Sequence, residues 1–200
     1  MTQVILSCFS DINDAEDDMK QDKVSDAILV FRLQRRDELA FQELVNQWEP
    51  RLYYYLRRII GDENAVWDIL QETWLSVFEG IRKLKDPLRF PTWLYQISHN
   101  KAVSYLRKEN KHTQMTNEQM VKYSEKNTAI SVVKEQAELV HELLGKLKLA
   151  HREVLVLYFL EGFSMREMAQ IIGVSEGTVK SRLYYAKNEM YEALKGAKDV

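Results

Sequence analysis

Cysteine, glycine and proline are all scarce in this sequence of 200 residues. The single cysteine, Cys8, excludes an intramolecular disulfide, and no group of Cys, His and Asp has the spacing of a zinc site. The four histidines are scattered along the chain. We therefore expect no disulfide framework, no metal and no cofactor, and a reducing cytosol as the natural compartment.

Long apolar runs and export signals are also missing. No stretch approaches the roughly eighteen apolar residues that a membrane-spanning helix needs. The first nine residues, MTQVILSCF, lack the basic start of a signal peptide and run directly into the acidic stretch DINDAEDD. The sequence therefore predicts neither export nor insertion into a membrane, and a cytoplasmic protein.

Recognisable catalytic groupings are absent too. The sequence has no nucleophile with a neighbouring base, no glycine-rich phosphate loop and no evident pair of carboxylates. We therefore predict that the protein is not an enzyme.

The net charge of −2 hides an uneven distribution of charge along the chain. Residues 1–26 hold two basic and seven acidic side chains, whereas residues 27–111 hold fourteen basic and eleven acidic ones. We expect the first 25 residues to be an acidic, disordered extension, with mimicry of DNA as the alternative. Because a weakly charged body makes few phosphate contacts, the protein alone should bind DNA poorly.

Apolar residues recur at three- and four-residue intervals, which is the spacing of amphipathic helices. This pattern predicts an all-α chain. The predicted helices, with a possible break at Asp37 in the first, are Asp26–Gln47, Pro50–Ile60, Asn64–Ile81, Thr92–Lys108, Glu135–Lys148, His151–Glu161 and a final pair. The candidates for the buried side of the first helix are Ile28, Phe31, Leu33, Phe41, Leu44 and Val45.

A polar segment divides the chain into two parts. Residues 111–134 have few large apolar side chains and no helical stripe, which is typical of a linker. The sequence therefore predicts two small helical domains, over residues 26–110 and 135–200, joined by this linker and preceded by the acidic extension over residues 1–25.

The most specific motif is SMREMAQIIGVSEGTVKSRLYYAK, residues 164–187. Ser164 and Glu167 have the spacing of a capping box, and Gly173 can take the left-handed conformation that ends a helix. A second helix then restarts at Ser175. This pattern predicts a helix-turn-helix, whose second helix enters the major groove of DNA, with an ordinary helical hairpin as the alternative. The candidate DNA contacts are Ser175, Glu176, Thr178, Lys180, Ser181, Arg182 and Tyr184.

Two stretches of the first domain carry further candidates. Asp68, Gln71 and Glu72 share one side of a predicted helix, although a polar side is by itself typical of a solvated face. Residues 90–111 interleave aromatic rings with cations and amides, a combination that suits unpaired bases and a nucleic-acid backbone. The candidates in this stretch are Phe90, Trp93, Tyr95, Asn100, Lys101, Ser104, Arg107 and Lys108. A core role is an equal alternative for Trp93.

Taken in order, these parts resemble the sigma-70 family of bacterial transcription initiation factors, and specifically its small extracytoplasmic-function group. The resemblance covers roughly residues 26–195. It is carried by AFQELVNQW, DILQETWLSVF, FPTWLYQISHNKAVSYLRK and HREVLVLYFLEGFSMREMAQIIGVSEGTVKSRLYYAK.

The resemblance implies that the protein brings core RNA polymerase to promoters. Residues 90–108 would open the minus-10 element and read its melted strand, with Asn100 and Lys101 near a flipped base. The C-terminal helix pair would read the double-stranded minus-35 element and touch the β flap. The residues implied in docking on the β′ clamp are Asp68, Gln71, Glu72 and Trp74. The resemblance also implies an anti-sigma factor, often membrane-bound, that holds the protein inactive.

A helix-turn-helix alone does not choose between a sigma factor, a repressor and a response-regulator output domain. The competing hypothesis is a stand-alone repressor or activator whose N-terminal domain dimerises. The polar side at residues 68–72 and the aromatic segment after it favour the sigma factor, because a stand-alone regulator has no need of them.

Overall fold

The computed structural model describes residues 24–116 and 142–196, and across these residues the regular elements are helices. The prediction of an all-α chain is confirmed. The predicted acidic extension lies outside the described residues apart from its last two positions, and so does the predicted linker from residue 117 onward.

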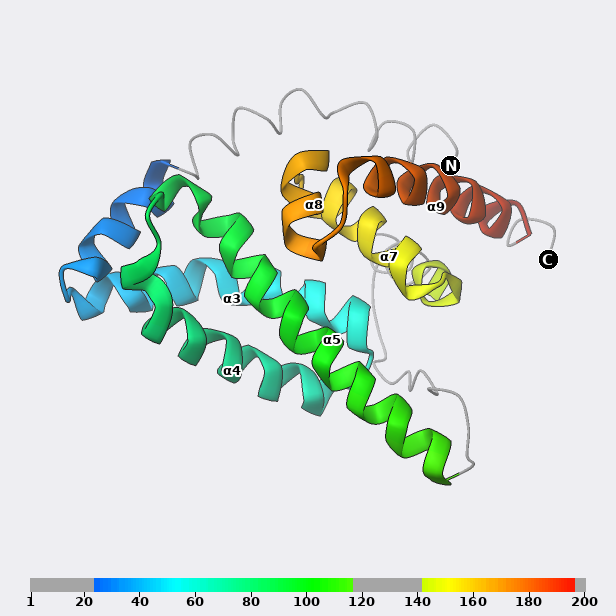
Figure 1. Cartoon of the computed structure of the whole chain (residues 1–200), viewed down its shortest axis with the longest axis horizontal. Helices are drawn as coiled ribbons and strands as arrows, with labels where there is room; N and C mark the ends of the chain where they lie inside the picture. The colour runs from blue at the N-terminus through cyan, green and yellow to red at the C-terminus, as the bar shows by residue number, and fades with distance from the viewer. Residues whose placement is uncertain (1–23, 117–141, 197–200) are drawn as a thin grey trace, which may run out of the picture.

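The N-terminal part is a bundle of four helices (Figure 1). Its long elements are a helix over 24–34, α3 (Glu38–Ile60), α4 (Glu63–Gly80) and α5 (Phe90–Thr116). Two short 3-10 turns, η1 (Ile81–Lys83) and η2 (Pro87–Arg89), connect α4 to α5. Helix α5 therefore continues past the domain boundary that we predicted at residue 110.

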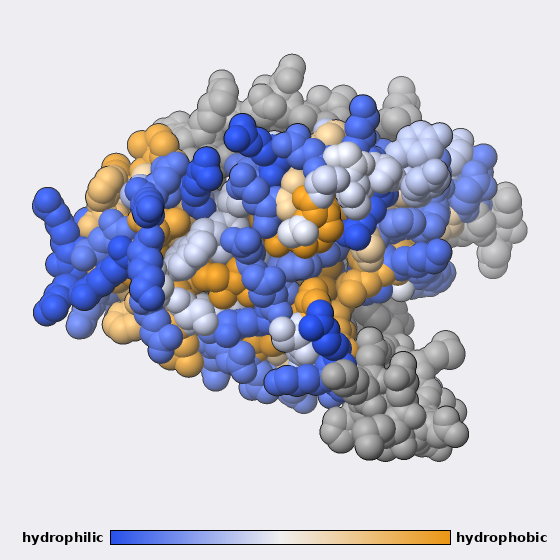
Figure 2. All heavy atoms as spheres, viewed as in Figure 1, coloured by the Kyte–Doolittle hydropathy of each residue, from blue (hydrophilic) through white to orange (hydrophobic). Residues whose placement is uncertain are grey.

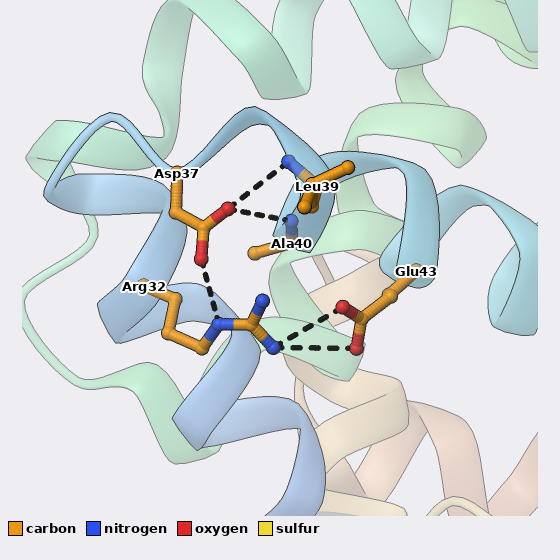
Figure 3. Close-up of polar contacts among 5 residues, drawn as sticks. All are labelled: Arg32, Asp37, Leu39, Ala40 and Glu43. Atoms are coloured by element: carbon orange, nitrogen blue, oxygen red, sulfur yellow. Dashed lines mark hydrogen bonds and ion pairs between the residues drawn. The ribbon is translucent and has the colours of Figure 1, made fainter.

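The break that we predicted at Asp37 is present, and Asp37 itself starts the next helix (Figure 3). Its carboxylate accepts hydrogen bonds from the amides of Leu39, at 3.1 Å, and Ala40, at 3.4 Å. Arg32 donates to the same carboxylate at 2.8 Å and also contacts Glu43. The residue before the cap, Arg36, has a φ of 73°, in the left-handed region that side chains other than glycine rarely adopt.

Pro50 does not start a helix, contrary to our prediction, because α3 runs straight through it. A proline inside a helix removes one backbone hydrogen bond and crowds the carbonyl four residues earlier, which costs about 3 kcal/mol. Trp48 and Leu52, on either side of it, are buried in the core. Burying a large apolar side chain contributes about 1.5–3 kcal/mol, so tertiary packing offsets the cost.

The buried side of the first predicted helix differs in part from the one that we predicted. Ile28 and Phe31 are more than half exposed, and Ala27 and Val30 are buried instead, whereas Leu33 and Leu44 are buried as predicted. Phe41 and Val45 are partly buried against the core. Apolar residues occupy both sides of this helix, whereas the rest of the bundle covers only one of them. Figure 2 shows hydrophobic side chains gathered at the end of the molecule where the helix over 24–34 lies.

The C-terminal part consists of a short helix over 142–146, α7 (Leu149–Leu155), a π-helical turn η3 (Val156–Leu160), α8 (Met165–Ile172) and α9 (Glu176–Gly196). The two parts are in contact. Helix α8 packs against α5, and α7 packs against α3 (Figure 1). Buried residues from both parts form one continuous apolar cluster.

Candidate nucleic-acid interface

The start and end of α8 have the geometry that the sequence predicts. The backbone amide of Glu167 donates to the Ser164 hydroxyl at 3.3 Å, and the Glu167 carboxylate accepts from the Ser164 amide at 3.0 Å. Gly173 has a φ of 74° and its amide donates to the carbonyl of Ala169. The capping box and the left-handed turn are therefore both confirmed.

Helix α9 restarts the chain and presents one face outward. Ser175 caps it, since the amide of Thr178 donates to the Ser175 hydroxyl at 3.1 Å. Val179 and Leu183 are buried against the preceding helices, which turns the opposite side toward solvent. Of the predicted contacts, Thr178 and Arg182 are partly buried, and those exposed are Ser175, Glu176, Lys180, Ser181 and Tyr184.

Two neighbouring residues extend this face and were not among our candidates. Tyr185 is 58% exposed and its ring lies 5.5 Å from that of Tyr184. The ammonium of Lys187 lies over the rings of Tyr158 and Phe159, 5.4 and 5.2 Å from their centroids. The sequence does show two adjacent tyrosines followed by a lysine. Helical periodicity alone, however, does not predict that both rings face outward.

The predicted minus-10 candidates on α5 divide between its two sides. Asn100, Ser104, Arg107 and Lys108 are exposed. Lys101 is partly buried, and its ammonium lies 3.3 Å from the carboxylate of Glu72 on α4. This side of the helix therefore offers cations and an amide next to the polar face of α4.

The aromatic candidates lie elsewhere. Phe90 and Tyr95 are fully buried, and the Tyr95 hydroxyl donates to Glu161 of the C-terminal part. Burial raises the pKa of this hydroxyl well above its usual value, with the Glu161 charge adding to the effect. In this arrangement neither ring is free to stack on a base. Trp93 is partly buried and packs against Phe90 and over the backbone of Gly80.

The polar face of α4 is open to solvent, with one exception among the four candidates. Asp68, Gln71 and Glu72 are exposed. Trp74 is buried instead, and its ring meets that of Phe41 edge to face at 5.9 Å. The helical spacing places residue 74 on the side that α3 covers, so its implied contact with another protein is not available here.

Exposed apolar side chains border this polar face. Leu75 and Phe78 on α4 are 64% and 57% exposed. Apolar side chains of this size, surrounded by polar ones, are typical of a protein-binding surface. Sequence reasoning missed them because the apolar residues of an amphipathic helix are first assigned to the core.

Within residues 24–116 and 142–196, no group of three or more His, Cys, Asp or Glu side chains could hold a metal ion. No helix in these two ranges is long and apolar enough to cross a membrane.

Family models match both parts of the chain. Residues 44–112 match sigma-70 region 2, and residues 137–190 match sigma-70 region 4. Together the two matches cover more than half of the sequence.

Individual proteins match over most of their length. The chain is 27% identical to the ECF RNA polymerase sigma-E factor of Haemophilus influenzae, over 86% of this chain and 95% of the relative. It is 26% identical to the ECF RNA polymerase sigma factor SigW of Bacillus subtilis, over 83% and 95%. Among solved structures, CnrH in complex with the cytosolic domain of CnrY superposes with a TM-score of 0.64 at 26% identity, over 86% of this chain and 97% of that one.

Proposed function

The chain belongs to the sigma-70 family, in its extracytoplasmic-function group, and is a sigma factor that directs RNA polymerase in transcription initiation; we propose that its two domains divide this work. Residues 26–110 act as region 2, which binds polymerase and the minus-10 element. Residues 135–200 act as region 4, which reads the minus-35 element.

Polymerase binding takes place on the face of α4 that carries Asp68, Gln71 and Glu72. This assignment is supported by their exposure on one side of the helix. It is also supported by the exposed side chains of Leu75 and Phe78 beside them, because a mixed apolar and charged surface suits a protein partner. We extend the proposed surface to these two residues, and we leave out Trp74 because it is buried.

Minus-10 recognition takes place on the exposed side of α5. Asn100 can hydrogen-bond the edge of an unstacked base, and Arg107 and Lys108 can follow the phosphate backbone. The ion pair between Lys101 and Glu72 joins this side of α5 to the polymerase-binding face of α4. Polymerase bound at α4 would therefore lie directly beside the melted strand.

Minus-35 recognition takes place on the outward face of α9. Lys180 and Arg182 can reach guanine edges or phosphates, and the Ser175 and Thr178 hydroxyls suit phosphate oxygens. The exposed rings of Tyr184 and Tyr185 add apolar contact area. Glu176, at the start of the helix, can accept a hydrogen bond from the amino group of cytosine.

The mechanism requires no bond to be made or broken by this subunit. Each domain alone holds DNA weakly, and polymerase fixes both so that the second contact forms at a high effective concentration. Melting follows from capture of bases that have already unstacked. We accordingly propose that the protein is not an enzyme, that it works in the cytoplasm with the chromosome and polymerase, and that an anti-sigma factor restrains it.

One observation carries this proposal: a chain with both family regions has three exposed faces, on α4, α5 and α9. The side chains of these faces suit polymerase, the minus-10 element and the minus-35 element, respectively. Runoff transcription with purified bacterial core polymerase, on a pool of upstream DNA regions, tests it. We expect discrete new start sites with the native chain, and at least tenfold weaker transcripts with the Asp68→Ala/Glu72→Ala variant.

The matched control is Glu142→Ala/Glu192→Ala, which removes two exposed carboxylates from the C-terminal part and should transcribe like the native chain. Absence of any start site, together with DNA binding by the protein alone, would contradict the proposal and favour a stand-alone regulator.

A further inference from the structure

Three arginines from two distant parts of the chain line a shallow hollow at one end of the N-terminal bundle. Arg35 and Arg36 lie in the turn between the helix over 24–34 and α3, and Arg82 lies in η1. Together with Gln34 they line a hollow of about 470 Å³. Figure 1 shows this turn and the segment between α4 and α5 at the same end of the bundle. The hollow is therefore assembled only when the domain folds.

Gln34 fixes the two segments against each other. Its side-chain amide donates to the backbone carbonyls of Ile81 and Leu84, both at 2.9 Å. These partners lie 47 and 50 residues away in the chain. The amide of Arg36 donates to the carbonyl of Leu33 at 2.9 Å, which closes the turn. The three exposed guanidinium groups therefore extend from a defined backbone frame.

These guanidinium groups have no carboxylate partner within the part of the chain that the structure describes. Arg32, one turn earlier, shows the alternative, because it pairs with Asp37 at 2.8 Å and also with Glu43 (Figure 3). Residues 34–36 and 81–85 hold five cations and no acidic side chain. Like charges that are brought together repel one another, so the hollow is suited to an anion from outside the chain.

The backbone of Arg36 points to a role for its side chain. Its φ of 73° lies in the left-handed region, where glycine is favoured and a side chain costs free energy. The residue follows the end of a helix, and glycine is the usual residue at such a position. Strained residues of this kind cluster at binding sites. An arginine here lowers stability but adds a third positive charge to the hollow.

Phosphate is the anion that best fits this arrangement. A guanidinium presents a planar set of donors that matches the oxygens of a phosphate group. The hollow is open to solvent, which suits a strand that passes across it better than an enclosed small molecule.

The hollow also lies next to the proposed minus-10 surface, because η1 and η2 lead directly into α5. Asn100 is about 15 Å along α5 from the first residue of the helix, and a few nucleotides of a single strand span such a distance. A strand held on the exposed side of α5 can therefore continue into the hollow.

We propose that Arg35, Arg36 and Arg82 form a phosphate-binding site for the melted promoter strand, beyond the bases held on α5. This inference rests on the proposed function. Arg35 and Arg36 precede residue 44, where the match to sigma-70 region 2 begins, so the site lies partly outside the matched region. Contacts with the backbone carry no sequence information. The site therefore prolongs the life of the open complex without changing which promoter is chosen.

Holoenzyme on a premelted promoter template tests the site. Arg36→Gly removes one guanidinium and relieves the strained φ, so this variant should fold at least as stably as the native chain. We expect its complexes to dissociate at least threefold faster. The slope of log K against log salt concentration should fall by about 0.7, the value for one phosphate contact on a single strand. Arg82→Ala should behave alike, and Arg36→Lys, which keeps the charge, should recover most of the lifetime.

Lys83→Ala is the matched control, because Lys83 is exposed beside Arg82 but does not line the hollow. This variant should keep the native lifetime within about twofold. If it dissociates as fast as Arg36→Gly and Arg82→Ala, only the general positive charge of this end matters and the site is overturned. Native lifetimes in both arginine variants would overturn it too.

Neutral methylphosphonate linkages identify the phosphate that is bound. They replace single phosphates along the strand beyond the minus-10 element. One position should shorten the lifetime with the native chain and have no further effect with Arg36→Gly, because the contact is already lost. Absence of any such position would contradict the proposal.

Two other outcomes separate the possible causes of failure. If Arg36→Gly and Arg82→Ala bind core polymerase more weakly in the absence of DNA, the hollow takes an acidic protein surface and the proposal fails. If native holoenzyme forms no complex on the template and initiates no transcript, the proposed function itself is wrong.

Discussion

Gly173, in the turn between α8 and α9, allows one substitution to be predicted with its sign and size. Its φ of 74° lies in the left-handed region, and a Cβ built on it meets no atom within 4 Å. Gly173→Ala therefore adds no steric contact, and its effect is conformational. A non-glycine residue in this region costs roughly 1 to 2 kcal/mol, so we expect the free energy of unfolding to fall by that amount.

Gly177, four residues later in α9, is the matched control. Gly177→Ala makes the same chemical change in the first turn of a helix, where the added Cβ would meet the Ser175 hydroxyl at an ordinary 3.8 Å. Alanine is preferred over glycine in a helix by about 0.5 to 1 kcal/mol. We therefore expect this variant to be slightly more stable than the native chain, which reverses the sign seen at Gly173.

Thermal and urea unfolding, followed by far-ultraviolet circular dichroism, measures both variants. For a chain of 150 to 250 residues, 1 kcal/mol corresponds to about 2–4 °C in Tm, so the two variants should lie on either side of the native chain. A Gly173→Asn variant should recover part of the loss, because asparagine tolerates the left-handed region. If Gly173→Ala and Gly177→Ala changed stability in the same direction, the left-handed turn would be the wrong explanation.

Three further outcomes follow from the contacts described above. Arg36→Gly should raise the free energy of unfolding by up to about 1 kcal/mol, since glycine adopts the positive φ without strain; an unchanged urea midpoint would contradict this. Lys180→Ala and Arg182→Ala should each weaken promoter binding by holoenzyme. Loss of a phosphate contact should reduce the slope of log K against log salt concentration by about 0.9. A slope unchanged in both variants would show that neither cation contacts the phosphate backbone of DNA. Burial raises the pKa of Glu161 in the folded state. The protonated side chain therefore contributes its full stability at acid pH below the unfolded-state pKa, and this contribution is lost as the pH rises through the raised folded-state pKa. Glu161→Gln, which can still accept from Tyr95, should therefore gain in stability over the native chain as pH rises from 4 to 7, and parallel pH profiles would refute the assignment.

Local chemistry allowed much of the fold to be predicted from sequence. The capping box at Ser164, the left-handed Gly173 and the break at Asp37 each depend on residues within four positions of one another, and all three are present. The all-α class follows from periodicity in the same way. Membership of the sigma-70 family, which the order of four motifs implied, is confirmed by the matches to both family regions.

The incorrect predictions concern long-range packing. Whether Pro50 interrupts a helix depends on how much its neighbours bury, and which side of the helix over 24–34 is covered depends on where the rest of the bundle lies. Trp74 was assigned to a surface by the family resemblance and Tyr95 by its residue type, yet both are buried. Tyr95 contacts a residue 66 positions away, and no pattern in the sequence predicts such a contact. The roles of the exposed candidates stay predictions.

The π-helical turn at Val156–Leu160 determines the direction in which two buried carboxylates, Glu153 and Glu161, point. Both accept hydrogen bonds from tyrosine hydroxyls of the N-terminal bundle. The amide of Glu161 donates to the carbonyl of Val156, five residues back instead of four. In a regular helix, residues eight apart differ by about 80° around the axis, whereas residues seven apart differ by about 20°. By accommodating one extra residue, the turn brings Glu153 and Glu161 onto nearly the same side.

This places an unusual constraint on insertions and deletions. Losing one residue from a helix normally rotates everything beyond it by about 100° and moves buried groups to the surface. Within Val156–Leu160, a chain one residue shorter could close the ordinary hydrogen-bond ladder and still direct both carboxylates into the neighbouring domain. We therefore expect natural variation in the length of this helix to be tolerated at the turn and nowhere else between Glu153 and Glu161.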